Sequence, residues 1–144
     1  MKLDVYFVDA FTDKVFSGNP AAVIFTDIDD ENLMQKIAFE NNLSETAFIN
    51  TNQDTYYIRW FSPIKEVDLC GHATLASAYI YFNYINKDED KVSFMSASGE
   101  LSVRKTDDLY ELDFPKDNLK KIDMTDQVED CIGVKPIETF IGDI

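Results

Sequence analysis

The alternation of hydrophobic and polar residues predicts several short strands in the first part of the chain. Residues 3–11 (LDVYFVDAF) and residues 21–26 (AAVIFT) are the first two predicted strands. The second has no polar alternation, which is typical of a strand buried on both faces. Residues 44–50 and 56–63 are the next two, with a turn predicted at residues 51–54 between them.

Two helices are predicted by apolar spacing. Residues 27–42 place four apolar residues on one face, and Asp29 or Asp30 can cap the start of this helix. Residues 71–83 form the second helix, in which the segment ATLASAYIYF (73–82) carries no charge on any side. A helix of this kind has to be surrounded, and in a small chain rich in strands a curved sheet is the natural wrapping.

The later part of the chain alternates again. Residues 91–98, 100–106 and 109–115 predict three antiparallel strands, and residues 125–133 predict a short helix ended by Gly133. The last residues, 134–144, have a strand-like pattern. We therefore expect an α+β fold in which a mixed or antiparallel curved sheet wraps around a central apolar helix. Residues 1–115 are the predicted domain, and residues 116–144 are a C-terminal extension of it.

Charge and cysteine content narrow the classes of partner and the compartment. The chain has 13 basic residues against 27 acidic ones, a net charge of −14, which disfavours binding to nucleic acid. No apolar segment approaches the roughly 20 residues that span a bilayer, and acidic residues interrupt the apolar stretch at the N-terminus as they would not in a signal peptide. The two cysteines form no disulfide framework. These features favour a cytoplasmic protein.

The segment EVDLCGHATL (66–75) holds the candidate chemistry, because it contains the only histidine of the chain, His72, at the start of the apolar helix. The free N–H groups and the dipole of a helix N-terminus attract anions. Gly71 would let a ligand approach the backbone, and His72 could donate or carry a proton. The alternative is structural: Gly71 is a turn residue and His72 bonds a backbone carbonyl.

Three stretches together resemble the PhzF-like family, the relatives of a phenazine-biosynthesis isomerase. They are VDAFTDKVFSGNPAAV (8–23), NNLSETAF (41–48) and RWFSPIKEVDLCGHATLA (59–76). The resemblance implies a fold similar to diaminopimelate epimerase, in which two halves each wrap a mixed sheet around a central helix. It also implies a biosynthetic enzyme that moves a proton between carbons of a small carboxylate substrate without a cofactor.

The same resemblance assigns roles to individual residues. It makes Glu45 the general acid and base, His72 a second polar group of the active site, and the amides around Gly71 and His72 a cradle for the substrate carboxylate. Cys70 is part of the candidate binding site, and two roles stay open for it. Related epimerases use a thiol at the mouth of the corresponding helix, whereas a buried cysteine is more often inert. No metal site is expected, because His72 has no partner at ligand spacing.

The sequence resembles one half of the family's pattern, and this leaves two hypotheses. In the first, the chain is a PhzF-like isomerase whose cleft is completed by a separate second half or by another chain. In the second, it is a non-catalytic half-domain that dimerises and at most binds a small carboxylate. A face that meets a second half would be apolar and exposed, and such faces seek partners. We therefore expect a homodimer or a pairing with a second half.

Overall fold

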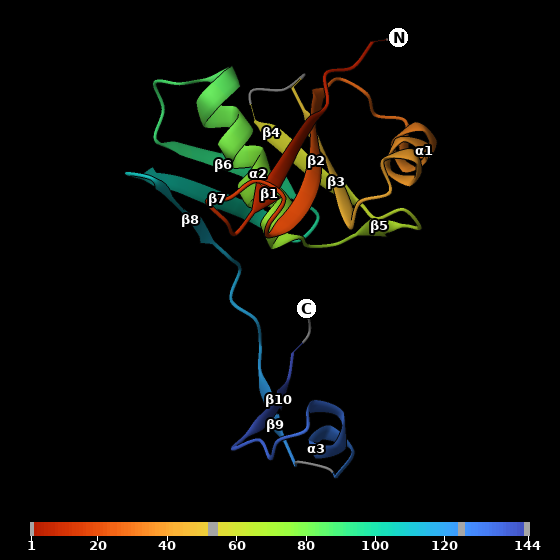
Figure 1. Ribbon diagram of the computed structural model, residues 1–144, viewed down its shortest axis with the longest axis vertical. Helices are drawn as coiled ribbons and strands as arrows, with labels where there is room; N and C mark the ends of the chain where they lie inside the picture. Colours follow the sequence, from red (N-terminus) through yellow and green to blue (C-terminus); the bar gives the residue numbers. More distant parts are fainter. Residues whose placement is uncertain (1, 52–54, 124–125, 143–144) are drawn as a thin grey trace. The chain divides into compact units, whose positions relative to one another are not determined.

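The computed structural model describes residues 2–51, 55–123 and 126–142. The chain divides into two compact units, Met1–Phe114 and Pro115–Ile144, each of which is considered by itself (Figure 1). The turn expected at residues 51–54 and the first residue of the helix expected at residues 125–133 lie wholly or partly outside the described residues.

One mixed sheet of eight strands forms the frame of the first unit. Its strand order is β1-β2-β3-β4-β6-β7-β8, with β5 paired to β4. Neighbours are antiparallel except for β2 with β3 and β4 with β6, which are parallel and are each joined through a helix. The strands are β1 (Tyr6–Ala10), β2 (Asn19–Thr26), β3 (Glu45–Asn50), β4 (Tyr56–Phe61), β5 (Glu66–Val67), β6 (Lys91–Ser96), β7 (Gly99–Thr106) and β8 (Leu109–Asp113). The predicted α+β fold with a mixed sheet is confirmed.

The apolar helix α2 (Gly71–Ile80) packs on the inner face of the curved sheet, as predicted (Figure 1). Ala73, Ala76 and Ile80 are buried with the inward side chains of the strands in the larger of two hydrophobic clusters. A single π-helical turn, Tyr81–Ile85, continues the helix, and the N–H of Asn86 donates to the carbonyl of Tyr81 at its end. The helical segment therefore ends close to the predicted position, although its last turn is wider than expected.

Helix α1 (Glu31–Asn41) covers the outer face of the same sheet (Figure 1). Asp30 is its N-cap, and its carboxylate accepts hydrogen bonds from the N–H groups of Asn32 and Leu33, which confirms one of the two predicted caps. Met34 and Ala38 pack in the smaller hydrophobic cluster. The apolar face of this helix therefore packs against the sheet, as its spacing predicted.

The second unit contains a two-stranded sheet and a short helix. Strands β9 (Lys120–Ile122) and β10 (Thr139–Ile141) pair antiparallel, and α3 (Asp126–Ile132) lies between them in the chain. Gly133 follows the helix with φ of 73°, a left-handed conformation that ends helices. The sequence did not predict β9, because its residues show no alternation.

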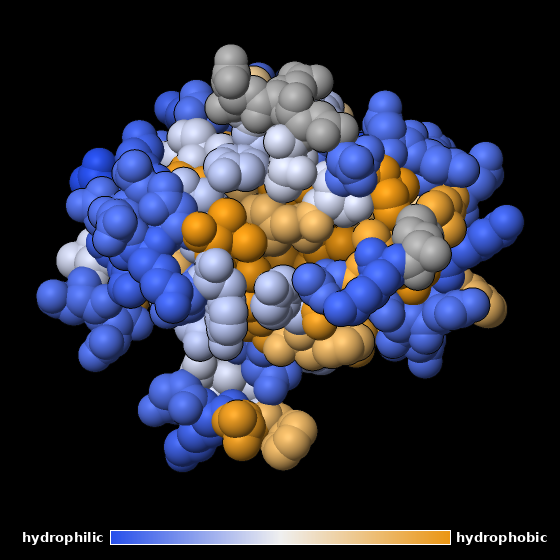
Figure 2. Space-filling view, turned by 90° about the horizontal axis from the view of Figure 1, so that it is seen from above, coloured by the Kyte–Doolittle hydropathy of each residue, from blue (hydrophilic) through white to orange (hydrophobic). Residues whose placement is uncertain are grey.

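Figure 2 shows one face of the molecule, with a group of hydrophobic residues in the middle and hydrophilic side chains on both sides of it. Many exposed large hydrophobic residues accompany the charged ones, including Phe11, Val15 and Phe16 in the loop after β1. Among the described residues, none of the helices has both the length and the apolar character needed to cross a bilayer.

Candidate active site

Glu45 and His72 come together at one end of the inner face. Glu45 is the first residue of β3 and shares its inward parity with Ala47 and Ile49, which are fully buried under α2. His72 is the second residue of α2. The Nε2 atom of His72 lies 3.3 Å from Oε2 of Glu45, and the two side chains are 9% and 20% exposed. The two residues that the resemblance selects are therefore direct neighbours, partly shielded from water.

Ser44 and Pro20 complete the surroundings of the imidazole, and the sequence did not assign either of them. The hydroxyl oxygen of Ser44 lies 3.4 Å from Nε2 of His72 and also contacts Asn19 Oδ1 at 3.3 Å. Burial lowers the pKa of His72, while the Glu45 carboxylate and the Pro20 carbonyl oppose that effect. His72 is consequently a neutral imidazole at neutral pH. Ser44 precedes Glu45 in the motif SETAF, and this position was the sequence signal that could have identified Ser44 as a site residue.

Cys70 lies on the other side of the same imidazole. Its Sγ atom is 3.4 Å from Nδ1 of His72, and the residue is 8% exposed. Burial raises the pKa of the Cys70 thiol to about 12, and the Glu45 carboxylate adds to this, against the N–H groups of Ala73 and His72. A thiol that keeps its proton at neutral pH is a poor nucleophile and a poor base. These surroundings argue against the use of Cys70 as a catalytic thiol.

The absence of a side chain at Gly71 matters because a side chain of the protein itself packs against its backbone. A Cβ atom on Gly71 would lie 2.7 Å from the ring carbon Cζ of Phe114, the residue that follows β8 by one position. Phe114 is half exposed. The carboxylate cradle expected at the amides of Gly71 and His72 stays a prediction, and a ligand that approaches Gly71 would have to displace this ring.

Three potential metal-binding side chains meet at this site. One ligand atom from each of Glu45, Cys70 and His72 lies within 4.8 Å of the others. The sequence argument against a metal rested on the absence of partners at ligand spacing, and the fold removes that argument because it brings distant residues together. The pKa of Cys70 is raised in the absence of an ion, and a bound cation would itself remove the proton of a coordinating thiol. The absence of a metal at this site stays a prediction.

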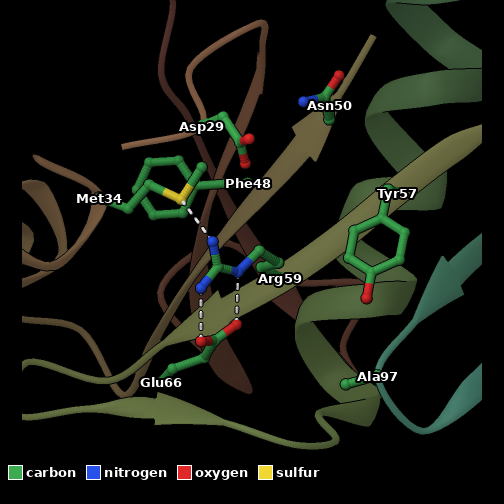
Figure 3. A pocket seen from close by; sticks show the side chains of 8 residues that line it. All are labelled: Asp29, Met34, Phe48, Asn50, Tyr57, Arg59, Glu66 and Ala97. Carbon is green, nitrogen blue, oxygen red and sulfur yellow. Dashed lines mark hydrogen bonds and ion pairs between the residues drawn. The ribbon is translucent and has the colours of Figure 1, made fainter. Parts of the chain in front are cut away.

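A pocket lies on the outer face of the sheet (Figure 3). It has a volume of about 360 Å³ and is lined by Asp29, Met34, Phe48, Asn50, Tyr57, Arg59, Glu66 and Ala97. The guanidinium of Arg59 points into it and is held by both carboxylate oxygens of Glu66, at 2.6 and 2.7 Å, and by Glu31 at 3.0 Å. Because two carboxylates already neutralise this arginine, the pocket is a poor site for an anionic ligand.

The loop between β1 and β2 is fixed next to the candidate site. The carboxylate of Asp9 accepts a hydrogen bond from the N–H of Phe16 at 2.9 Å, a bond of the kind that aspartate side chains make in turns. Gly18 has φ of +95°, and a Cβ on it would lie 2.3 Å from the carbonyl oxygen of Ala10. The loop leads directly into Asn19 and Pro20 beside His72, and it exposes Phe16 almost completely, at 98%.

Comparison with known proteins identifies the family of the chain. The chain matches the profile of the family described as phenazine biosynthesis-like protein over residues 8–130. It is 44% identical over 142 residues to an uncharacterized isomerase of Pseudomonas aeruginosa, covering 97% of this chain and 54% of that protein. It is 43% identical over 153 residues to the human phenazine biosynthesis-like domain-containing protein, covering 100% of this chain and 53% of the relative. The chain thus spans about half the length of these curated relatives.

Solved structures lead to the same family. A PhzF-family phenazine biosynthesis protein of Enterococcus faecalis superposes with a TM-score of 0.87 at 46% identity, covering 99% of this chain and 55% of that one. A predicted epimerase of Pseudomonas aeruginosa matches at a TM-score of 0.71 and 21% identity, which shows a shared fold of the diaminopimelate epimerase type. With the family profile, the sequence identity and the fold all in agreement, the chain belongs to the phenazine biosynthesis-like (PhzF) family.

Proposed function

We propose that this chain provides the acid–base half of a cofactor-free isomerase that moves a proton between carbons of a small carboxylate substrate. The observation that carries the proposal is the pairing of Glu45 with His72 at 3.3 Å, at the edge of a buried core. Membership of the PhzF family, whose relatives include proteins named as isomerases, supports the reaction class. The substrate carboxylate is assigned to the amides at the start of α2.

Glu45 is the proposed general base and acid. Its carboxylate takes the proton from one carbon of the substrate, the electron pair of the broken C–H bond moves into the conjugated system, and the same carboxyl group returns a proton to another carbon. The reaction is balanced without any redox partner. General acid–base catalysis of this kind contributes roughly 10²–10⁴-fold to a rate. The buried apolar residues of β3 and α2 around Glu45 keep water away from the transferred proton.

His72 is the proposed hydrogen-bond donor that orients Glu45 and the substrate. A neutral imidazole carries one N–H group, and the low pKa that burial gives His72 keeps the ring in that form. Such a ring holds the Glu45 carboxylate without competing for the proton that is moved.

The test is deuterium wash-in from D₂O into a dihydroanthranilate-like carboxylate, followed by NMR. Wild type is compared with Glu45→Gln, which keeps the size of the side chain and removes the proton acceptor. Glu66→Gln is the matched control, because it changes a glutamate on the outer face of the sheet. We expect Glu45→Gln to slow exchange by about 10²–10⁴-fold and Glu66→Gln to leave it unchanged. Equal exchange in Glu45→Gln and wild type would refute the assignment.

A second candidate function is a non-catalytic half-domain that pairs with another chain and binds a small carboxylate. One observation favours it: the loop beside the candidate site exposes Phe11, Val15 and Phe16. Apolar surface of this kind is a usual feature of interaction sites. No deuterium exchange in wild type would favour this candidate over the enzyme.

Assembly and compartment are part of the same proposal. We infer a homodimer, or a pairing with a second half, through the face that carries Glu45, His72 and the β1–β2 loop. Light scattering at micromolar concentration tests the dimer, and replacing Phe16, the most exposed of the loop residues, with Asp should weaken it; a monomer in wild type would refute the homodimer. A cytoplasmic location is inferred from the two cysteines, Cys70 and Cys131, both of which are free.

A further inference from the structure

The hydrogen-bonding groups around His72 restrict which of its two nitrogens carries the proton. Nε2 faces Oε2 of Glu45 at 3.3 Å and the hydroxyl of Ser44 at 3.4 Å. In its ionised form, the form that accepts a proton from carbon, the Glu45 carboxylate can only accept hydrogen bonds. Nε2 therefore has to be the donor, because two lone pairs facing each other at this distance would repel.

A neutral imidazole with its proton on Nε2 has a lone pair on Nδ1, and this lone pair needs a donor. The Sγ atom of Cys70 lies 3.4 Å from Nδ1, a distance suited to an S–H···N hydrogen bond. The thiol is buried and keeps its proton far above neutral pH, since burial raises its pKa to about 12. A protonated thiol can donate where a thiolate could only accept.

The backbone holds Cys70 in this position. Cys70 is the N-cap residue of α2 with an extended backbone, φ −145° and ψ 112°. Its carbonyl accepts two hydrogen bonds from Thr74, one from the N–H at 3.3 Å and one from the hydroxyl at 2.6 Å. These hydrogen bonds fix the backbone from which the Cys70 side chain extends, and its Sγ atom contacts the ring of His72, two residues later in the chain.

We propose that Cys70 is a positioning residue for the proposed proton transfer: its S–H group donates to Nδ1 of His72 and holds the imidazole in the tautomer whose Nε2–H faces Glu45. Its role in turnover rests on the proposed function, whereas the tautomer itself does not. Cys70 thus acts through His72 and needs no contact with the substrate. The Glu45 carboxylate competes for the thiol proton, because it is also a hydrogen-bond partner of the Cys70 side chain.

The first test is ¹⁵N NMR of the imidazole, and it needs no assignment because the chain has one histidine. The sample is the untagged chain, labelled with ¹⁵N-histidine, at neutral pH and with EDTA present. We expect Nε2 to be protonated and Nδ1 to show the resonance of a nitrogen that accepts a hydrogen bond. Cys70→Ala should shift the Nδ1 resonance toward that of an unbonded nitrogen, and Cys70→Ser should restore it because a hydroxyl also donates. A protonated Nδ1 in wild type would overturn the proposal. An Nδ1 resonance at the same position in Cys70→Ala and wild type would also overturn it.

The second test follows the thiol itself and stays informative if Cys70→Ala fails to fold. In a Cys131→Ala background Cys70 is the only thiol, and Raman spectroscopy reports its S–H stretch. We expect a frequency lowered by hydrogen bonding that rises in His72→Gln and persists in Glu45→Gln. The reverse pattern, loss of the lowering only in Glu45→Gln, would show that the thiol donates to the carboxylate and would overturn the proposal.

Turnover gives a third readout that separates the two proposals. If exchange at carbon occurs, Cys70→Ala should reduce it by about 10–100-fold, the size of effect that partners orienting metal-bound histidines have, and Cys70→Ser should recover most of it. An equal loss in Cys70→Ser and Cys70→Ala would contradict a positioning role. A chain without turnover whose ¹⁵N spectrum shows the expected bond would refute the proposed function and leave the tautomer standing.

Discussion

Each face of the sheet holds a glutamate beside a basic side chain, and the two pairs differ in their burial and in the charge of the base. On the outer face Glu66 and Glu31 surround Arg59 in a roomy pocket that is open to water. On the inner face Glu45 meets His72 at the edge of the apolar core that encloses α2. The outer pair is a permanent ion pair, and the guanidinium bonds raise the pKa of Arg59 further above its usual range. The inner pair combines a carboxylate with a base that burial keeps neutral.

The difference shows that a pocket with room for a ligand can lack an arginine that is free to bind it. The outer pocket has a volume of about 360 Å³, but its arginine is already neutralised by Glu66 and Glu31. In the inner site, burial lowers the pKa of His72 and raises the pKa of Cys70, so these two groups differ in protonation from free side chains.

The largest expected effect tests whether the inner face holds most of the stability. Phe94→Ala removes a fully buried ring of the larger cluster and should lower the free energy of unfolding by about 3–5 kcal/mol. Phe39→Ala on α1 is the control, because Phe39 is 68% exposed and should cost about 0.5 kcal/mol or less. Urea denaturation measures both variants. Comparable losses would show that the faces are not distinguished by burial.

Alkaline pH should affect the inner cluster through Cys70. A thiol with a pKa of about 12 in the folded chain and 9.0 as its ordinary value stabilises the fold below pH 9, and this contribution is lost as pH rises toward 12. Between pH 8 and 10.5 the difference in unfolding free energy between wild type and Cys70→Ala should change by about 2 kcal/mol, to the disadvantage of wild type. Denaturation under reducing conditions measures it. Cys131→Ala, at an exposed position, should run parallel to wild type.

Mildly acidic pH should affect the same cluster through His72, with the opposite sign. The folded pKa of His72 is lowered, so its contribution to stability is present above the unfolded value of about 6.5 and is lost as pH falls below it. The urea midpoint of wild type should decrease between pH 7 and pH 5. Because His72 is the only histidine, His72→Gln should flatten this slope. A slope that is unchanged in His72→Gln would assign the effect to carboxylates.

The smallest expected effect concerns the outer pair. A double-mutant cycle with Arg59→Met and Glu66→Gln should give a coupling free energy of about 1 kcal/mol or less, because both side chains are partly exposed, 20% for Arg59 and 34% for Glu66. The coupling should shrink in 1 M salt. A coupling of several kcal/mol that resists salt would mean that this pair is as shielded from water as the inner one.

The sequence predicts the fold of the first unit well because its patterns are local and strong. The unbroken run AAVIFT became a strand buried from Ala21 to Ile24, and the uncharged helix after Gly71 became the centre of the core. Strand β9 was missed because two lysines occupy a strand of three residues. Its pairing with β10 is the kind of tertiary contact that overrides local preference.

The site was only partly predictable. The resemblance selected Glu45 and His72, but no local rule brings Ser44, Pro20 and Cys70 around one imidazole, since this depends on the register of β2 with β3 and on where α2 starts. The contact of Phe114 with Gly71 depends on the path of the chain after β8. The sequence argument against a metal site does not hold, because it used spacing along the chain, and residues far apart in the chain can lie close together in the fold.

The parallel pairing of β4 with β6 has a consequence for how the chain folds. The two strands are separated by the whole of α2, so the sheet cannot close around that helix until residues near Met95 are available. Contacts between residues far apart in sequence slow folding. During synthesis the apolar helix α2 is therefore exposed to water until β6 pairs with β4. Such exposed apolar surface promotes aggregation. We expect the yield of folded chain in cells to depend on chaperones more strongly than its final stability would indicate.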